Sequence, residues 1–150
     1  MSKRLTIALD AMGGDRAPAM VVEGAALAVT RFPHVEFLFF GDEQRLKSLV
    51  SVHPGLSSVA TIHHADDIVT NDDKPSMALR GRRKSSMRMA IDAVKNKGAD
   101  AVVSAGNTGA LMAISKVVLK TQKGIDRPAI ASEFPTVRGS TCMLDLGANV

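Results

Sequence analysis

Residues 104–113 read Ser-Ala-Gly-Asn-Thr-Gly-Ala-Leu-Met-Ala and directly follow the apolar run Ala-Val-Val. This order predicts a strand, a glycine turn and a helix, which is a junction typical of α/β folds. The first turn of a helix leaves backbone N–H groups unpaired, and the helix dipole favours negative charge there. Gly106 and Gly109 let the backbone approach a ligand closely, and Asn107 or Thr108 can cap the helix. The stretch therefore predicts a site for a phosphate or an oxyanion.

A second junction of the same kind opens the chain. Residues 5–9 form an apolar run, Asp10-Ala-Met-Gly-Gly-Asp15 follows, and a helix is expected from Pro18. Open parallel sheets bind ligands at the carboxyl ends of their strands, so we expect both loops to face one crevice. Glycines after strands also serve simply to turn the chain and cap helices, and this structural role stays an alternative for either loop. Neither loop matches G-x-G-x-x-G or the P-loop.

The rest of the sequence alternates between short apolar strands and longer amphipathic helices. Strands are predicted at 5–9, 35–40, 59–64, 101–103, 129–133 and 141–144, and helices at 18–31, 42–51, 85–97 and 107–121. Asp42 is the expected cap of one of these helices, and Ser85-Ser86 are the expected cap of another. Residues 66–84 form a long, charged connection, which is typical of functional or mobile segments. The alternation favours a parallel α/β fold.

Composition narrows the choice of partners and compartment. The net charge is only +4, and five Phe without Trp or Tyr leave few stacking platforms, so we expect no nucleic-acid partner. The single cysteine, Cys142, is typical of a small core residue in a reducing cytoplasm. No signal peptide is recognised, and no apolar run approaches the ~20 residues of a spanning helix. We therefore expect a cytoplasmic protein, with peripheral membrane contact left open.

Five blocks, taken together, carry a family resemblance. They are Asp10-Ala-Met-Gly-Gly-Asp15, Lys74-Pro-Ser-Met-Ala-Leu-Arg80, Ser85-Ser-Met-Arg88, Ser104-Ala-Gly-Asn-Thr-Gly-Ala110 and Asp145-Leu-Gly-Ala-Asn149. In this order they resemble the bacterial phosphate acyltransferases of phospholipid synthesis. Members of that family are longer, so residues 1–150 resemble the amino-terminal part of one α/β acyltransferase domain, with the remainder of the family's length absent.

The resemblance implies a fold, an activity and partners. The implied fold is a three-layer α/β/α sandwich with a mostly parallel sheet, like that of the isocitrate and isopropylmalate dehydrogenases. The implied reaction moves a fatty acyl group from acyl carrier protein to inorganic phosphate and gives acyl phosphate. A homodimer with peripheral association at the cytoplasmic membrane is implied, and no metal or organic cofactor is expected.

This chemistry suits the two glycine loops, because phosphate must be held close to a thioester carbonyl and the tetrahedral oxygen needs prearranged donors. We expect Asn107 and Asn149 to be the catalytic donors. The expected phosphate-binding residues are Gly13, Gly14, Ser104, Gly106, Thr108 and Gly109. An acidic side chain repels phosphate unless it is protonated or paired, so Asp10, Asp15 and Asp145 are interpreted first as caps or turn residues. Because they stand at strand ends, a role as a base or an orienting group is the alternative.

Positive charge gathers between residues 80 and 88. We expect Arg80, Arg82, Arg83 and Arg88 to dock the acidic acyl carrier protein, and a merely solvated helix face is the alternative. Two other functions stay open at this point. One is a nucleotide-binding, dehydrogenase-like enzyme, because fold alone does not fix function. The other is a non-catalytic phosphate-binding module.

Overall fold

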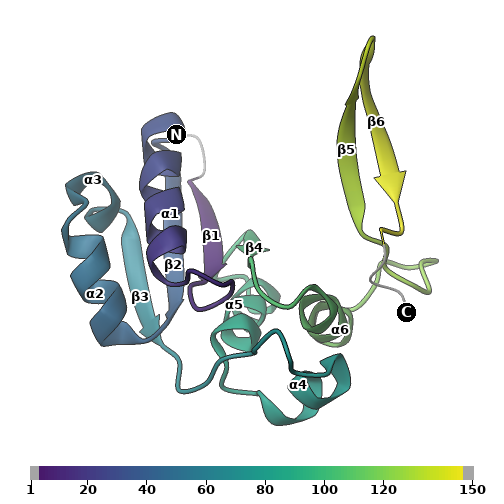
Figure 1. Cartoon of the computed structure of the whole chain (residues 1–150), viewed down its shortest axis with the longest axis horizontal. Coiled ribbons are helices and arrows are strands. Elements are labelled where there is room, and N and C mark those ends of the chain that lie inside the picture. The colour runs from purple at the N-terminus through teal and green to yellow at the C-terminus, as the bar shows by residue number, and fades with distance from the viewer. Residues whose placement is uncertain (1–3, 147–150) are drawn as a thin grey trace.

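The computed structural model describes residues 4–146 and shows a four-stranded parallel sheet with helices on both faces (Figure 1). The strand order is β3-β2-β1-β4, with bounds β1 Leu5–Asp10, β2 Val35–Gly41, β3 Ala60–His64 and β4 Ala101–Val103. The helices are α1 Ala19–Arg31, α2 Glu43–Ser51, α3 Pro54–Ser57, α4 Pro75–Gly81, α5 Ser86–Lys95 and α6 Thr108–Leu119. The predicted α/β class with a mostly parallel sheet is confirmed.

The two faces of the sheet follow from the alternation of side chains along each strand. Leu9 and Phe39 point into the core beneath α1, α2 and α3. Ala8 and Phe40 point the other way and pack against α5. Helix α6 then packs on α4 and α5 through a third cluster that includes Ile114. The arrangement is consistent with the expected three-layer sandwich.

The charged connection between β3 and α5 contains a helix that the sequence analysis did not predict. Helix α4 starts at Pro75, a residue whose fixed φ suits the first helical position. Its Ala78 is buried against α6, and Leu79 packs beside it. The seven residues of α4 are too few for a clear helical period in the sequence. The four-residue α3 was missed for the same reason.

The last two strands form a separate antiparallel hairpin, β5 Ala131–Thr136 and β6 Gly139–Leu144. Both strands are exposed along nearly their whole length, and Phe134 and Met143 are 45% and 44% exposed. The predicted burial of Cys142 is wrong: this residue lies exposed in β6, because no element of the described chain covers the hairpin. Within residues 4–146, no helix is both long and apolar enough to cross a membrane.

A groove of about 690 Å³ runs along α1, on the face of the sheet that α1, α2 and α3 cover. Apolar side chains of β1, α1 and β2 line most of it, and Val103 of β4 borders it. Val103 is 55% exposed, because the helices on this face cover β2 and β1 but leave β4 open. One end of the groove reaches Asp10 and Ser104, where the strands end and the two glycine loops begin.

Candidate functional site

The two glycine loops are in contact at the carboxyl edge of the sheet. We call residues 10–15, after β1, the first glycine loop, and residues 104–109, after β4, the second glycine loop. They meet because β1 and β4 are neighbouring parallel strands. A Cβ atom placed on Gly13 would lie 3.0 Å from the Gly106 backbone nitrogen, and one placed on Gly106 would lie 3.1 Å from Gly13 Cα. The loops therefore share one edge of the sheet, as the sequence predicted.

Glycine is required in the first loop for two separate reasons. Gly13 has no room for a side chain, since its Cβ would also lie 2.5 Å from Asp10 Oδ2 and 2.9 Å from Ser104 Oγ. Gly14 has a φ of +104°, a backbone conformation that other residues adopt only with strain. Both positions thus require glycine on structural grounds, and their expected part in phosphate binding stays a prediction.

The second glycine loop leads into α6 and leaves backbone donors open. Asn107 is the cap of this helix, because its Oδ1 accepts a hydrogen bond from the Ala110 backbone nitrogen at 2.9 Å. The backbone N–H groups of Thr108 and Gly109 have no hydrogen-bond partner within residues 4–146. They lie in the first turn of a twelve-residue helix, where the dipole is positive. An anion can be held there by backbone groups alone.

The amide nitrogen of Asn107 is used inside the protein. It donates to the backbone oxygens of Thr70, Asn71 and Asp73 at 3.1, 3.3 and 2.9 Å. We call residues 66–75, the segment that these bonds hold, the strap. With its oxygen on the helix and its nitrogen on the strap, Asn107 acts here as an anchor. Its role as a catalytic donor stays a prediction.

The strap is also tied to the first glycine loop and to the end of α4. Asn71 Nδ2 donates to Asp15 Oδ1 at 3.0 Å. Arg82 forms ion pairs with Asp67 at 2.8 Å and with Asp73 at 3.2 Å. The strap therefore contacts both glycine loops. Sequence analysis marked this segment only as a charged connection, although its run of Asp and Asn residues was the available signal.

Hydrogen bonds and charge at the strap shift two pKa values. The pKa of Asp73 is lowered, first by a hydrogen bond from the Thr70 backbone and then by one from Arg82. The pKa of Arg82 is raised, chiefly by its hydrogen bond to Asp73 and by the charge of Asp67. Both shifts favour the charged forms of the two side chains, which are the forms that make the ion pair.

Asp10, at the end of β1, is the buried acid of the site. Asp10 opens a turn, since its backbone oxygen accepts a hydrogen bond from the Gly13 nitrogen at 3.3 Å, while its side chain caps no helix within residues 4–146. It accepts hydrogen bonds from Ser86 Oγ at 2.6 Å and from Ser104 Oγ at 2.7 Å. Ser86 was expected only as part of a helix cap, and its contact across 76 residues has no local signal in the sequence.

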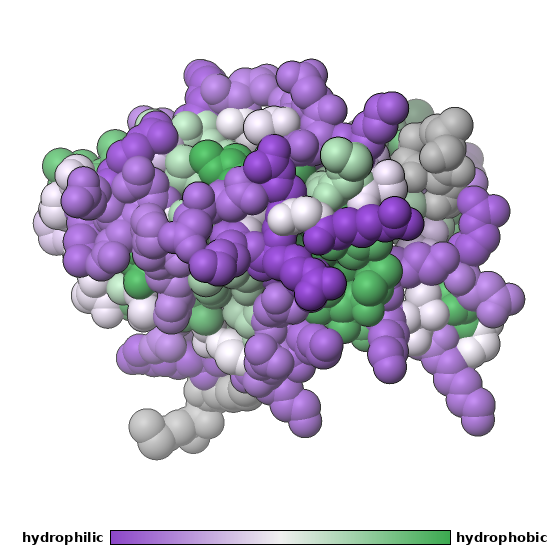
Figure 2. Space-filling view, turned by 90° about the horizontal axis from the view of Figure 1, so that it is seen from below, coloured by the Kyte–Doolittle hydropathy of each residue, from purple (hydrophilic) through white to green (hydrophobic). Residues whose placement is uncertain are grey.

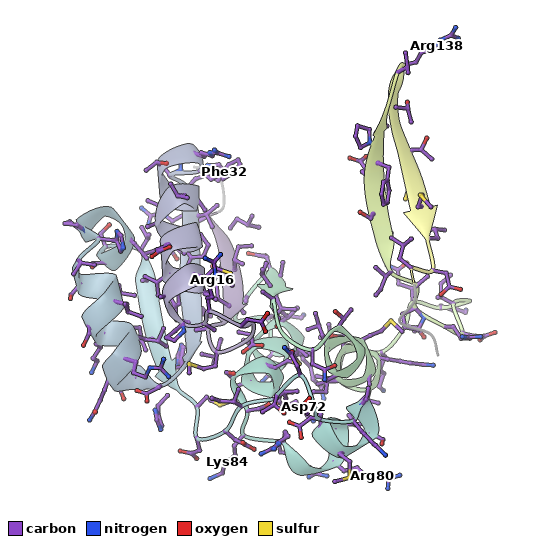
Figure 3. The ribbon with its side chains drawn as sticks, viewed as in Figure 1. Arg16, Phe32, Asp72, Arg80, Lys84 and Arg138 are labelled. Carbon is purple, nitrogen blue, oxygen red and sulfur yellow. The ribbon has the colours of Figure 1, made fainter. Side chains whose placement is uncertain are left out.

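The four arginines expected to dock a carrier protein fall into two pairs. Arg82 is tied to the strap, and Arg88 pairs with Asp92 at 3.0 Å on the same helix. Arg80 and Arg83 are exposed and form no ion pair in the part of the chain that the structure describes. Figure 3 shows Arg80 at α4, on the outer edge of the molecule. Of these four arginines, Arg80 and Arg83 are therefore the two without an ion pair in the described chain that would have to be broken when a partner binds.

Asn149 lies outside the described residues, so its expected catalytic role is not tested. Arg16, which follows the first glycine loop, is exposed and has no ion-pair partner in residues 4–146 (Figure 3). The described residues contain no group of three or more His, Cys, Asp or Glu side chains placed to hold a metal ion.

Comparison with known proteins gives a consistent result along the whole chain. The family model FA_synthesis, described as fatty acid synthesis protein, matches residues 5–150. The phosphate acyltransferase of Rhodospirillum centenum is 62% identical over 150 residues, which are 100% of this chain and 42% of that protein. Those of Paramagnetospirillum magneticum and Methylocella silvestris are 57% and 56% identical over the whole of this chain and 43% and 41% of their own lengths. The chain thus spans well under half the length of these curated relatives.

Proposed function

Because this chain belongs to the FA_synthesis family of fatty acid synthesis proteins, we propose that it is the amino-terminal part of a phosphate acyltransferase. The proposed enzyme transfers a fatty acyl group from acyl carrier protein to inorganic phosphate. A phosphate oxygen attacks the thioester carbonyl, a C–O bond forms and the C–S bond breaks. The carrier thiol leaves with the proton that phosphate gives up, and acyl phosphate is the product.

The observation that carries this proposal is the pair of open N–H groups on Thr108 and Gly109 beside the first glycine loop. Phosphate is small and strongly hydrated, so a site must replace its water with fixed donors. Two backbone donors at a helix start do this without bringing in a titratable group. The exposed hydroxyl of Thr108 adds a third donor at the same place.

The other predicted site residues take supporting roles in this proposal. Gly13 and Gly14 keep side chains out of the wall next to the anion. Ser104 and Gly106 set the path of the second glycine loop, since Ser104 Oγ accepts a hydrogen bond from the Gly106 nitrogen at 3.1 Å. Asn107 fixes the start of α6. No covalent acyl-enzyme is required, because phosphate itself is the nucleophile.

We propose that acyl carrier protein docks on the face that bears Arg80 and Arg83. Both are exposed cations, and Met77 on the same short helix is 66% exposed, so the face offers charge around an apolar contact. Figure 2, seen from below, shows a largely hydrophilic surface interrupted by a hydrophobic area. Arg82 ties the end of α4 to the strap through its ion pairs, and Arg88 pairs with Asp92 within α5.

Charge reversal separates the two pairs of arginines. Arg83→Glu should weaken carrier-protein binding most at low salt, because exposed charges steer association and salt screens them. Its thermal stability should match that of the wild type. Arg82→Glu should instead lower stability by disrupting the strap. The docking proposal would be contradicted if Arg83→Glu and the wild type bound acyl carrier protein equally well at low ionic strength.

A homodimer in the cytoplasm, with peripheral contact to the membrane, is proposed from the family resemblance. Phe134, Val137 and Met143 of the hairpin are exposed to solvent. Their exposure supports the proposal that another protein surface covers the hairpin. Sedimentation of the full-length protein and its flotation with anionic vesicles test these two points separately.

The decisive experiment incubates the full-length protein with acyl-acyl-carrier-protein and inorganic phosphate, and traps acyl phosphate with hydroxylamine. We expect hydroxamate to form only when all three components are present. Residues 1–150 are assayed beside it, and a residue-1–150 sample that binds phosphate without turnover would locate the missing groups in the absent part. Release of fatty acid without acyl phosphate, or binding of a dinucleotide instead, would contradict the proposal.

A further inference from the structure

One carboxylate joins three separate elements beneath the two glycine loops. Asp10 ends β1 and is only 2% exposed. Its Oδ1 accepts a hydrogen bond from Ser86, the first residue of α5, and its Oδ2 accepts one from Ser104, directly after β4. An ionised carboxylate can only accept, so both serine protons must point at Asp10. Asp10 thus sets the orientation of two hydroxyl groups.

The orientation of Ser104 has a consequence for the second glycine loop. Because its proton is directed at Asp10, Ser104 Oγ presents a lone pair to the Gly106 backbone N–H at 3.1 Å. The Gly106 N–H is thereby turned inward and is not available to a ligand. The backbone N–H groups of Thr108 and Gly109, which are unpaired within residues 4–146, then lie at the start of α6.

Close packing keeps this arrangement from adjusting. The Cβ that Gly13 lacks would lie 2.5 Å from Asp10 Oδ2 and 2.9 Å from Ser104 Oγ. Ser86 is fully buried, and no buried side-chain nitrogen or oxygen in residues 4–146 lacks a hydrogen-bond partner. A buried carboxylate with two hydroxyl donors in a tight space holds its partners firmly, because losing either bond leaves a charge without compensation.

We propose that Asp10 is a positioning residue of the anion site, which acts through Ser104 to hold the second glycine loop with its Thr108 and Gly109 amides open to phosphate. This inference rests on the proposed function for the identity of the anion. Asp10 does not touch phosphate. Its negative charge is tolerated near an anion because two hydroxyl dipoles already point at it.

The central test is Asp10→Asn in the full-length protein. Asn has the shape of Asp, but its amide nitrogen donates, so one serine hydroxyl must reverse. We expect the dissociation constant for inorganic phosphate, measured by calorimetry without acyl donor, to rise about tenfold, the size of one charged hydrogen bond. We also expect amide hydrogen exchange at Gly106 to quicken, because its acceptor is no longer fixed.

Adjacent serines supply a matched control. Ser85 is also fully buried, but it caps α5 by accepting from the Arg88 nitrogen at 3.2 Å and does not contact Asp10. Ser85→Ala should lower thermal stability and leave phosphate affinity unchanged. Ser86→Ala should weaken phosphate binding, and it replaces Asp10→Asn as the deciding variant if the latter does not fold.

A double-mutant cycle tests whether Asp10 acts through Ser104. The double variant Asp10→Asn/Ser104→Ala should bind phosphate about as well as Ser104→Ala alone, because both substitutions break the same hydrogen bond between Asp10 and Ser104. Additive losses, or unchanged phosphate affinity and unchanged Gly106 exchange in every variant, would overturn the inference. These readouts need no acyl donor, so failure of the wild type to make acyl phosphate would count against the proposed function and leave this test intact.

Discussion

The two glycine loops look alike in sequence but differ in how deeply they are buried. In the first loop, Gly13 is buried and surrounded on three sides by Asp10, Ser104 and Gly106. In the second, Thr108 is exposed and its backbone N–H group is unpaired within the described residues. Unpaired N–H groups occur in both loops of the described chain, so burial and not hydrogen bonding distinguishes them. The difference teaches that a glycine turn after a strand can be chiefly a packing element or chiefly an exposed loop.

Position in the sheet explains this division. Strand β1 lies between β2 and β4 and has helices on both faces, so the loop that follows it is enclosed. Strand β4 lies at the edge, and only three of its residues pair with β1. The loop after β4 is therefore free on one side and can meet a ligand.

The largest effect is expected from Gly13→Ala. The added Cβ would meet the Asp10 carboxylate at 2.5 Å and the Gly106 backbone at 3.0 Å, and neither can move without breaking the buried hydrogen bonds. We expect a loss of about 3 kcal/mol in the free energy of unfolding, with loss of activity, measured by denaturant titration. Gly24→Ala is the control. Gly24 has nothing within 4 Å and lies inside α1, so alanine should stabilise by about 0.5–1 kcal/mol.

Asn107→Ala should cost about 2 kcal/mol, because it removes a helix cap worth about 1 kcal/mol and the bonds that hold the strap. Asn107→Asp separates these contributions, since Asp keeps the capping oxygen but cannot donate to the strap carbonyls. We expect the Asp variant to keep α6 stable while protease cleavage within residues 66–75 becomes faster. Equal cleavage of the Asp variant and the wild type would show that the strap is held by other contacts.

Caps with short-range partners were accessible from sequence. Asp42, Ser85 and Asn107 each bond a backbone nitrogen three residues later, a spacing that residue type and position alone predict. The α/β alternation predicted the class of the sheet, which is parallel, but it did not predict the order of the strands. The bonds that assemble the site were not accessible, because Ser86 and Ser104 lie 76 and 94 residues from Asp10 and reach it only in the folded sheet.

Burial in the last part of the chain also depends on contacts that the local sequence does not predict. Cys142 stands in an apolar run, which predicted a core position, but a strand is buried only if another element covers it. The apolar run predicts a strand but does not predict whether that strand is buried or exposed. Likewise, the charge of residues 80–88 was visible in sequence, whereas the division into tied Arg82 and free Arg83 depends on where Asp67 and Asp73 lie in space.

Gly109→Ala should lower both stability and phosphate affinity in the second loop. Its Cβ would lie 2.9 Å from Pro75 Cγ, an atom of a ring that is closed onto the backbone at the start of α4, and 3.6 Å from Asn107 Oδ1. Overpacking costs about 1–3 kcal/mol and outweighs the gain of up to about 1 kcal/mol in helix propensity, so we expect a net loss of about 1 kcal/mol in unfolding free energy. Phosphate affinity should fall, because the methyl group stands beside an open N–H. Wild-type affinity would place the anion elsewhere on the loop.

The smallest effect is expected on acidification, and it concerns the strap alone. The pKa of Asp73 is lowered in the folded protein, so this carboxylate stabilises the strap fully above its ordinary pKa of about 3.9, and that contribution is lost as the pH falls through the lowered value. The protection of residues 66–75 against hydrogen exchange, relative to the intrinsic rate at each pH, should therefore fall below about pH 4 while that of β1 stays high. Asp73→Asn should show the lower protection already at neutral pH and lose the pH dependence. A strap whose exchange follows that of β1 at every pH would mean that it opens only with the whole sheet.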